Sequence, residues 1–127
     1  MAVTAQYASV PKSPTVALAT SNANRDGVTG TYATLLTAGA SGSRVDRIVI
    51  KALAATTAGQ VRIFVGTGLI KELYIPTTAT PSTTLPSYST EYVFENGLIL
   101  AASTVLKLNT EGGTNSFMVT ILSGGDF

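Results

Sequence analysis

The stretch VRIFVGTGLIKELYIP, residues 61–76, contains residue types and spacing that can form a nucleotide-binding site. An apolar run leads into Gly-Thr-Gly at positions 66–68, and a segment with helical character follows, as in phosphate-cradling loops. The dinucleotide fingerprint, however, needs a third glycine at the place where this chain has Lys71. Between Gly68 and Pro76 there is also too little chain for a crossover helix. The stretch therefore predicts a β-hairpin with a glycine-bearing turn, and not a nucleotide site.

The acidic residues are the next candidates for chemistry, as a catalytic pair or as metal ligands. Glu91 and Glu95 fall on one face of an expected strand, about 13 Å apart at about 3.3 Å per residue. That separation exceeds both carboxylate spacings used in glycoside hydrolysis. Asp46 has arginine neighbours and is better suited to an ion pair, and Asp26 lacks the alternating acids of a calcium loop. We therefore predict no catalytic residue, no metal site and no cofactor.

The composition narrows the function classes further. The chain has no His, no Cys and no Trp, so it lacks the usual proton-transfer group, thiolate chemistry and a favoured sugar-stacking side chain. Eight basic and seven acidic residues leave a net charge of +1, which gives no electrostatic footprint for nucleic acid. No apolar window approaches the about 18 residues of a membrane span, and the N-terminal segment lacks the pattern of a secretory signal. We therefore expect neither nucleic acid nor a membrane as a partner.

The elements that must position these residues are expected to be strands. Only 12% of the 127 residues are charged, whereas 20 are Thr and 11 are Ser, and threonine is favoured on a pleated surface. Turn signals recur about every 8 to 12 residues, which is the spacing of a sandwich or barrel. Asn96-Gly97 is the strongest tight-turn signal. The expected strands are 15–20, 31–38, 44–53, 60–66, 70–75, 88–95, 104–110 and 116–122.

Eight antiparallel strands divided between two sheets correspond to a jelly roll. We therefore predict an all-β chain with an antiparallel eight-stranded jelly-roll sandwich over residues 15–127 and an extended N-terminal arm over residues 1–14. The prolines of the arm disfavour a helix there.

The arm alternates small and apolar residues and carries almost no charge. Such a segment has too little apolar area to fold alone, yet it is more apolar than a solvated tail. Because a sandwich has open edge strands, we expect the arm to dock as an added strand on a neighbouring subunit. That neighbour is either a second copy of this chain, in a homodimer or homotrimer, or another protein. The arm residues expected to make the contact are Val3, Ala5, Tyr7 and Val10.

The basic residues are concentrated on two expected strands that follow each other along the chain. If these strands are adjacent and the side chains point outward, they form a modest positive patch that contacts a partner protein. The alternative is that they are ordinary solvated charges. The basic candidates are Arg44, Arg47, Lys51 and Arg62.

Three runs carry a resemblance to a known family. They are SRVDRIVIKALAATTAGQVRIFVGTG (43–68), LIKELYIPTTATPSTTLPSY (69–88) and LILAASTVLKLNTEGGTNSFMVTILSGGDF (98–127). Their pattern of strands and turns resembles small jelly-roll cement, or head-decoration, proteins of tailed double-stranded DNA bacteriophages. The resemblance implies a non-enzymatic protein on the outer surface of the virion capsid, where it clamps adjacent major capsid subunits. It brings no catalytic motif with it.

Two other classes share the expected architecture. A tail-fibre or other virion-associated jelly-roll module would bind carbohydrate or a receptor, and exposed aromatic side chains on loops or a calcium site would favour it. A small cupin-like enzyme would need metal ligands that are mostly His, and the chain has none.

Overall fold

The computed structural model describes residues 8–111 and 115–127, and these residues form two antiparallel sheets without a helix. The prediction of an all-β chain is therefore confirmed. The described residues contain nine strands, where the sequence analysis expected eight. They are β1 (Val10–Pro11), β2 (Thr15–Leu18), β3 (Ala33–Thr37), β4 (Ser43–Ala52), β5 (Gly59–Val65), β6 (Gly68–Ile75), β7 (Ser89–Leu100), β8 (Val105–Thr110) and β9 (Phe117–Asp126).

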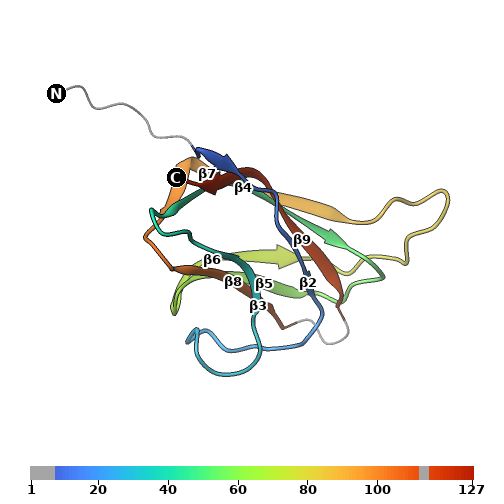
Figure 1. Ribbon diagram of the computed structural model, residues 1–127. Coiled ribbons are helices and arrows are strands. Elements are labelled where there is room, and N and C mark those ends of the chain that lie inside the picture. Colours follow the sequence, from blue (N-terminus) through green and yellow to red (C-terminus); the bar gives the residue numbers. More distant parts are fainter. Residues whose placement is uncertain (1–7, 112–114) are drawn as a thin grey trace.

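The strands are divided between two sheets that lie one over the other (Figure 1). In the five-stranded sheet, β9 pairs with β4 and β4 with β7, while β1 and β2 both pair with the other side of β9. The four-stranded sheet has the order β3-β8-β5-β6. Consecutive strands β4 and β5 therefore belong to different sheets, and this separates residues that are close in sequence.

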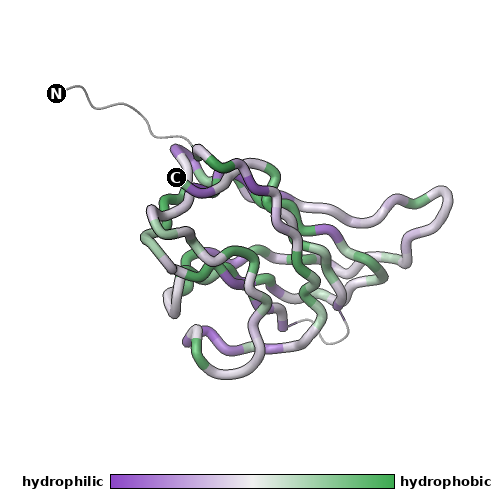
Figure 2. The backbone as a smooth tube through the Cα atoms, in the orientation of Figure 1, coloured by the Kyte–Doolittle hydropathy of each residue, from purple (hydrophilic) through white to green (hydrophobic). Residues whose placement is uncertain are grey.

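The core fills the space between the two sheets. Alternation along β4 turns Ile48 and Ile50 inward, and each is completely buried. Burial of an isoleucine side chain contributes roughly 1.5–3 kcal/mol, so this layer supplies much of the stability. Figure 2 shows the apolar segments concentrated on the strands. The core residues are Leu18, Leu35, Leu36, Ala38, Val45, Ile48, Ile50, Ala52, Val61, Ile63, Ile75, Leu100, Leu106, Leu108, Phe117, Val119 and Ile121.

The glycine-bearing stretch is the hairpin that the sequence predicts. Strands β5 and β6 pair antiparallel from Gly59 opposite Ile75 to Val65 opposite Gly68. Gly66 turns the chain with a φ of 60°, in the left-handed region that glycine adopts without strain. The segment that follows Gly68, which has helical character in the sequence, is strand β6. Its residues face the core and the outside of the sheet in alternation.

Asn96-Gly97 does not end a strand, although the sequence predicts a tight turn there. Both residues have positive φ, 62° and 79°, but they lie inside β7. Val93 pairs with Arg47 and Leu98 with Val45, so residues 94–97 form a bulge opposite a single residue of β4. The predicted tight turn is therefore wrong: the two positive φ values belong to a bulge, and the strand continues to Leu100.

The described part of the N-terminal arm pairs with this chain's own sheet. Val10 and Pro11 pair with Asp126 and Gly125 at the C-terminal end of β9. The ammonium group of Lys12 lies 2.5 Å from the Asp126 carboxylate. The last expected strand ended at residue 122, so the sequence predicted no partner for this strand, whereas β9 continues to Asp126. Val3, Ala5 and Tyr7 lie outside the described residues.

Gly125 allows β1 to approach β9 closely. A Cβ atom at this position would lie 2.1 Å from the carbonyl oxygen of Val10, and φ is 153°. We predict that Gly125→Ala detaches β1 and lowers the free energy of unfolding by about 1–3 kcal/mol. Denaturant unfolding measures the loss, and amide hydrogen exchange of residues 9–12 locates it.

Gly68→Ala is the matched control, because its Cβ would meet nothing closer than 3.4 Å and no positive φ is required. It should change the stability by less than about 0.5 kcal/mol. Equal effects of the two substitutions would show that β1 is not held by this close contact.

Candidate functional site

The two sheets present different outer faces. The loop of residues 19–32, between β2 and β3, curls over the outer face of the four-stranded sheet (Figure 1). On the five-stranded sheet, the outward side chains of β4 and β9 keep partial or full exposure. The two outer faces therefore differ in how far the described residues cover them.

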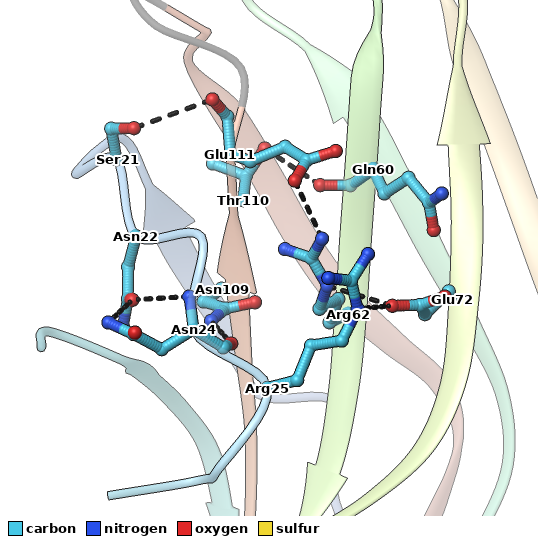
Figure 3. A network of polar contacts seen from close by, with 10 residues as sticks. All are labelled: Ser21, Asn22, Asn24, Arg25, Gln60, Arg62, Glu72, Asn109, Thr110 and Glu111. Carbon is cyan, nitrogen blue, oxygen red and sulfur yellow. Dashed lines mark hydrogen bonds and ion pairs between the residues drawn. The ribbon is translucent and has the colours of Figure 1, made fainter. Parts of the chain in front are cut away.

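Arg62 lies at the centre of the covered face. Its side chain has no accessible surface, although it points away from the core between the sheets. Nε donates to Oε1 of Glu72 at 2.9 Å and Nη2 donates to Oε2 of Glu111 at 2.6 Å (Figure 3). A buried guanidinium needs such partners, since an unpaired buried charge is strongly destabilising.

The predicted grouping of Arg62 with the basic residues of β4 is wrong. Arg62 is on β5, in the opposite sheet from Arg44, Arg47 and Lys51, and it is buried. Alternation along a strand correctly predicts that Arg62 points away from the core. It does not predict that a loop covers the side chain.

The loop contributes a second guanidinium to this cluster. Nε of Arg25 donates to the same oxygen of Glu72 at 2.6 Å, so this carboxylate bridges the loop and β5. Hydrogen bonds from Arg25 and Arg62 lower the pKa of Glu72. Burial by itself lowers the pKa of Arg62, but the bonds to Glu111 and Glu72 outweigh it and the pKa is raised. The two guanidinium groups thus neutralise the carboxylates of Glu72 and Glu111.

Asparagine side chains fix the loop beside the charged cluster. Buried Asn22 donates to the carbonyl oxygens of Thr29 at 3.1 Å and Thr31 at 3.0 Å, which ties the two ends of the loop together. Its own oxygen accepts from the backbone N–H of Asn24 at 3.0 Å. On β8, Asn109 donates to the carbonyl oxygen of Asn24 at 2.8 Å and so attaches the loop to the sheet.

The rest of the 19–32 loop is held by the ammonium group of Lys107 and by the aromatic rings of Tyr32 and Phe64. Nζ of Lys107 donates to the carbonyl oxygen of Gly27 at 2.6 Å and lies 4.6 Å from the centre of the Tyr32 ring. Tyr32 in turn packs edge-on against Phe64, with ring centres 5.1 Å apart. Phe64 is completely buried although it faces outward from β5. The loop therefore covers this face over Arg62 and Phe64, whereas Tyr74 on β6 remains exposed.

No described residue forms a layer over the other outer face at β2, β9, β4 and β7, and we call this surface the open face. Thr15, Thr120, Val49 and Glu91 form one row across β2, β9, β4 and β7, because each is the cross-strand partner of the next. The flanking rows follow from the same registers. The open face consists of Thr15, Ala17, Arg47, Val49, Lys51, Glu91, Val93, Met118 and Thr120.

Three of the basic candidates remain together on the outer side of β4. Arg47 and Lys51 belong to the open face, and Arg47 lies 3.8 Å from the Glu91 carboxylate. Arg44 lies near the N-terminal end of β4, where its Nε is 2.8 Å from Oδ1 of Asp46. Val10 is at the edge of the same sheet and is 53% exposed. The sequence analysis missed the threonine and methionine side chains around them, since β9 and β2 have no charge pattern to mark them.

A cleft of about 310 Å³ is lined by residues of the 8–13 segment, β4 and β9, among them Lys12, Arg44 and Asp46. Lys12 pairs with Asp126 and Arg44 with Asp46, so these charged groups neutralise one another. The cleft therefore has a polar lining but no converging set of reactive groups.

Most carboxylates of the chain serve its own structure. Six of the seven acidic residues have an ion pair or a hydrogen bond within the chain. They are Asp26, Asp46, Glu72, Glu91, Glu111 and Asp126. Over residues 8–111 and 115–127, no three His, Cys, Asp or Glu side chains gather in a way that could hold a metal ion. The same residues contain no helix able to cross a membrane.

Comparison of the chain with protein-family models, with curated proteins and with solved structures found no match.

We predict that Arg62→Met destabilises the protein by about 2–3 kcal/mol. The substitution leaves Glu72 and Glu111 without their common partner, and the loss is below that of a fully buried pair because both carboxylates keep some access to water. Arg47→Met removes the same group from the open face and should change the stability by less than about 0.5 kcal/mol. Denaturant unfolding of both variants tests this. Similar losses would contradict a special role for the buried guanidinium.

Stability should also fall in acid, because the pKa values of Glu72 and Asp126 are lowered in the folded protein. Hydrogen bonds from Lys12 and Ser43 cause the shift at Asp126. In the unfolded chain both carboxyl groups have pKa values of about 4. Their contribution to the free energy of unfolding is therefore complete above that pH and is lost as the pH falls through their lower pKa values in the folded protein.

Denaturant unfolding across the acid range measures this loss. The difference in unfolding free energy between the wild type and Asp126→Asn should be constant above about pH 5 and shrink below about pH 4. A difference that does not depend on pH would contradict the assignment.

Proposed function

We propose that this protein is a non-enzymatic structural protein of a virion: a cement, or decoration, protein that binds the outer face of a phage capsid and stabilises contacts between major capsid subunits. The observation that carries the proposal is the open face. No described residue forms a layer over this sheet surface, while the 19–32 loop covers the opposite face over Arg62 and Phe64. Such an arrangement suits attachment by one side.

The strand order supports the jelly-roll assignment that the proposal uses. Apart from β1, the sheets have the orders β2-β9-β4-β7 and β3-β8-β5-β6. This order follows when a long antiparallel hairpin folds over twice, as in the jelly rolls of viral capsid proteins. We assign β1 as an addition at the edge of an eight-stranded jelly roll. Because the same architecture serves lectins and cupins, the function has to be argued from the surface.

The composition of the open face favours a protein partner. Short or apolar side chains such as Val49, Val93 and Met118 occupy most of it, and Arg47 and Lys51 outnumber Glu91 by one charge. Protein interfaces combine an apolar centre with few charges in this way. The complementary surface is therefore flat, largely apolar and weakly acidic, and we assign it to the major capsid protein.

The proposal includes self-association as a homodimer or homotrimer. Strand β1 pairs over only two residues, and the Lys12 side chain of its ion pair with Asp126 is 42% exposed. An element held so lightly can exchange between copies and carry the residues before it onto a neighbour. The weak pairing of β1 at this sheet edge thus supports the expected contact of the arm with a neighbouring subunit. Val3, Ala5 and Tyr7 are the candidate residues for that contact.

A tail-fibre or other virion module that binds carbohydrate or a receptor is the alternative. The observation in its favour is Tyr74 on β6, which is 65% exposed on the sheet opposite the open face. A carbohydrate ligand would stack on this ring. Tyr74→Ser would then abolish binding, whereas a capsid contact through the open face would not be affected.

Purified protein added to expanded capsids that lack it tests the proposal. We predict that the wild type binds, and that the double variant Lys51→Glu with Val93→Asp binds at least about tenfold more weakly, equal to about 1.4 kcal/mol. Both substitutions reverse the charge or the polarity of the open face. Tyr74→Ser is the control on the other sheet and should bind as the wild type does.

Cosedimentation with capsids gives the affinities, and circular dichroism shows that the variants are folded. Failure of the wild type to bind any capsid preparation would overturn the proposed function. Binding that is unchanged in the double variant would instead reject the open face as the contact.

A further inference from the structure

Two buried polar atoms on neighbouring strands have no hydrogen-bond partner within the described residues. They are Nη1 of Arg62, which is a donor, and Oδ1 of Asn109, which is an acceptor. Arg62 on β5 and Asn109 on β8 are direct cross-strand partners, and both side chains have no accessible surface. A donor and an acceptor on paired residues are thus left without a partner in the buried layer beneath the 19–32 loop.

The mismatch cannot be removed by turning either side chain. Rotation of the Asn109 amide would place its oxygen against the carbonyl oxygen of Asn24, where its nitrogen now donates at 2.8 Å. The guanidinium of Arg62 is fixed by its bonds to Glu72 and Glu111. Figure 3 shows Asn109 on the opposite side of this guanidinium from Glu72.

We infer that one internal water molecule bridges Nη1 of Arg62 and Oδ1 of Asn109. A water oxygen accepts from the guanidinium while one of its hydrogens is donated to the amide oxygen, so both atoms are satisfied at once. Buried waters occur at polar positions of this kind and are held as part of the structure.

Charged ligands do not fit the same position. An anion such as chloride would accept from Nη1 but would face the oxygen of Asn109, with the carboxylates of Glu72 and Glu111 on the same guanidinium. A cation would be repelled by Arg62. The site therefore takes a neutral molecule that both accepts and donates, and its enclosed surroundings limit that molecule to water.

The water belongs to the attachment of the 19–32 loop. Asn109 holds the loop through its nitrogen and the water through its oxygen, while Arg62 holds the water and, through Glu72, the loop residue Arg25. The loop, the water and the two strands consequently form one connected polar network. We expect the water to exchange only when the loop opens.

A crystal structure of the full chain at a resolution that shows ordered water tests the inference directly. The expected result is a density peak within about 3.2 Å of both Nη1 and Oδ1. Crystals soaked in bromide should show no anomalous signal at this peak. A direct bond between the two atoms with no peak, or a bromide signal at the peak, would overturn it.

Solution measurements give a second readout. Oxygen-17 relaxation dispersion counts water molecules with long residence times, and Asn109→Leu should contain one fewer than the wild type because the acceptor is gone. Thr15→Val, on the open face, is the control and should keep the wild-type count. An unchanged count in Asn109→Leu would contradict the bridge. If that variant does not fold, the wild-type crystal structure still decides.

Discussion

The charge of Arg62 is the constraint from which the rest of the structure follows. A guanidinium cannot lose its proton in a protein, so its burial on β5 requires acceptors from elsewhere in the chain. Glu72 comes from the adjacent β6 and Glu111 from the end of β8. The three strands are thereby fixed in register on their outer side, as the apolar core fixes them on the inner side.

The same charge explains why one face of the sandwich is closed. Glu72 has a second guanidinium partner in Arg25, and this contact holds the loop of residues 19–32 over the sheet. With the loop in place, Phe64 and Arg62 become buried although both point away from the core. The protein thus has two layers on one side of its mid-plane, the four-stranded sheet and the loop, and the five-stranded sheet alone on the other. We place the proposed contact on the outer face of the five-stranded sheet because no described residue covers β4 and β9 there.

Alternation and turn signals were sufficient to predict the strands but not their neighbours. The hairpin at residues 59–75 and the inward residues of β4 follow from local patterns that each segment carries by itself. The position of Arg62 depends instead on which strands are adjacent and on a loop more than thirty residues earlier in the chain. Asn96 illustrates the same limit, since its positive φ was predictable whereas its location in a bulge depends on pairing with β4.

The types of side chain on the open face affect the free energy with which this sheet can bind a partner, because they set how much side-chain entropy is lost. Association is opposed by the loss of rotamer freedom in long side chains, about 0.5–1.5 kcal/mol for each one that becomes fixed. Threonine and valine are branched at Cβ and are already restricted at χ1 before any partner arrives. Thr15, Val49, Val93 and Thr120 belong to this class, and only Arg47, Lys51, Glu91 and Met118 are long and flexible. The low content of charged residues indicated strands in the sequence analysis. It also gives the open face few long side chains, so little side-chain conformational entropy is lost when a partner covers this face.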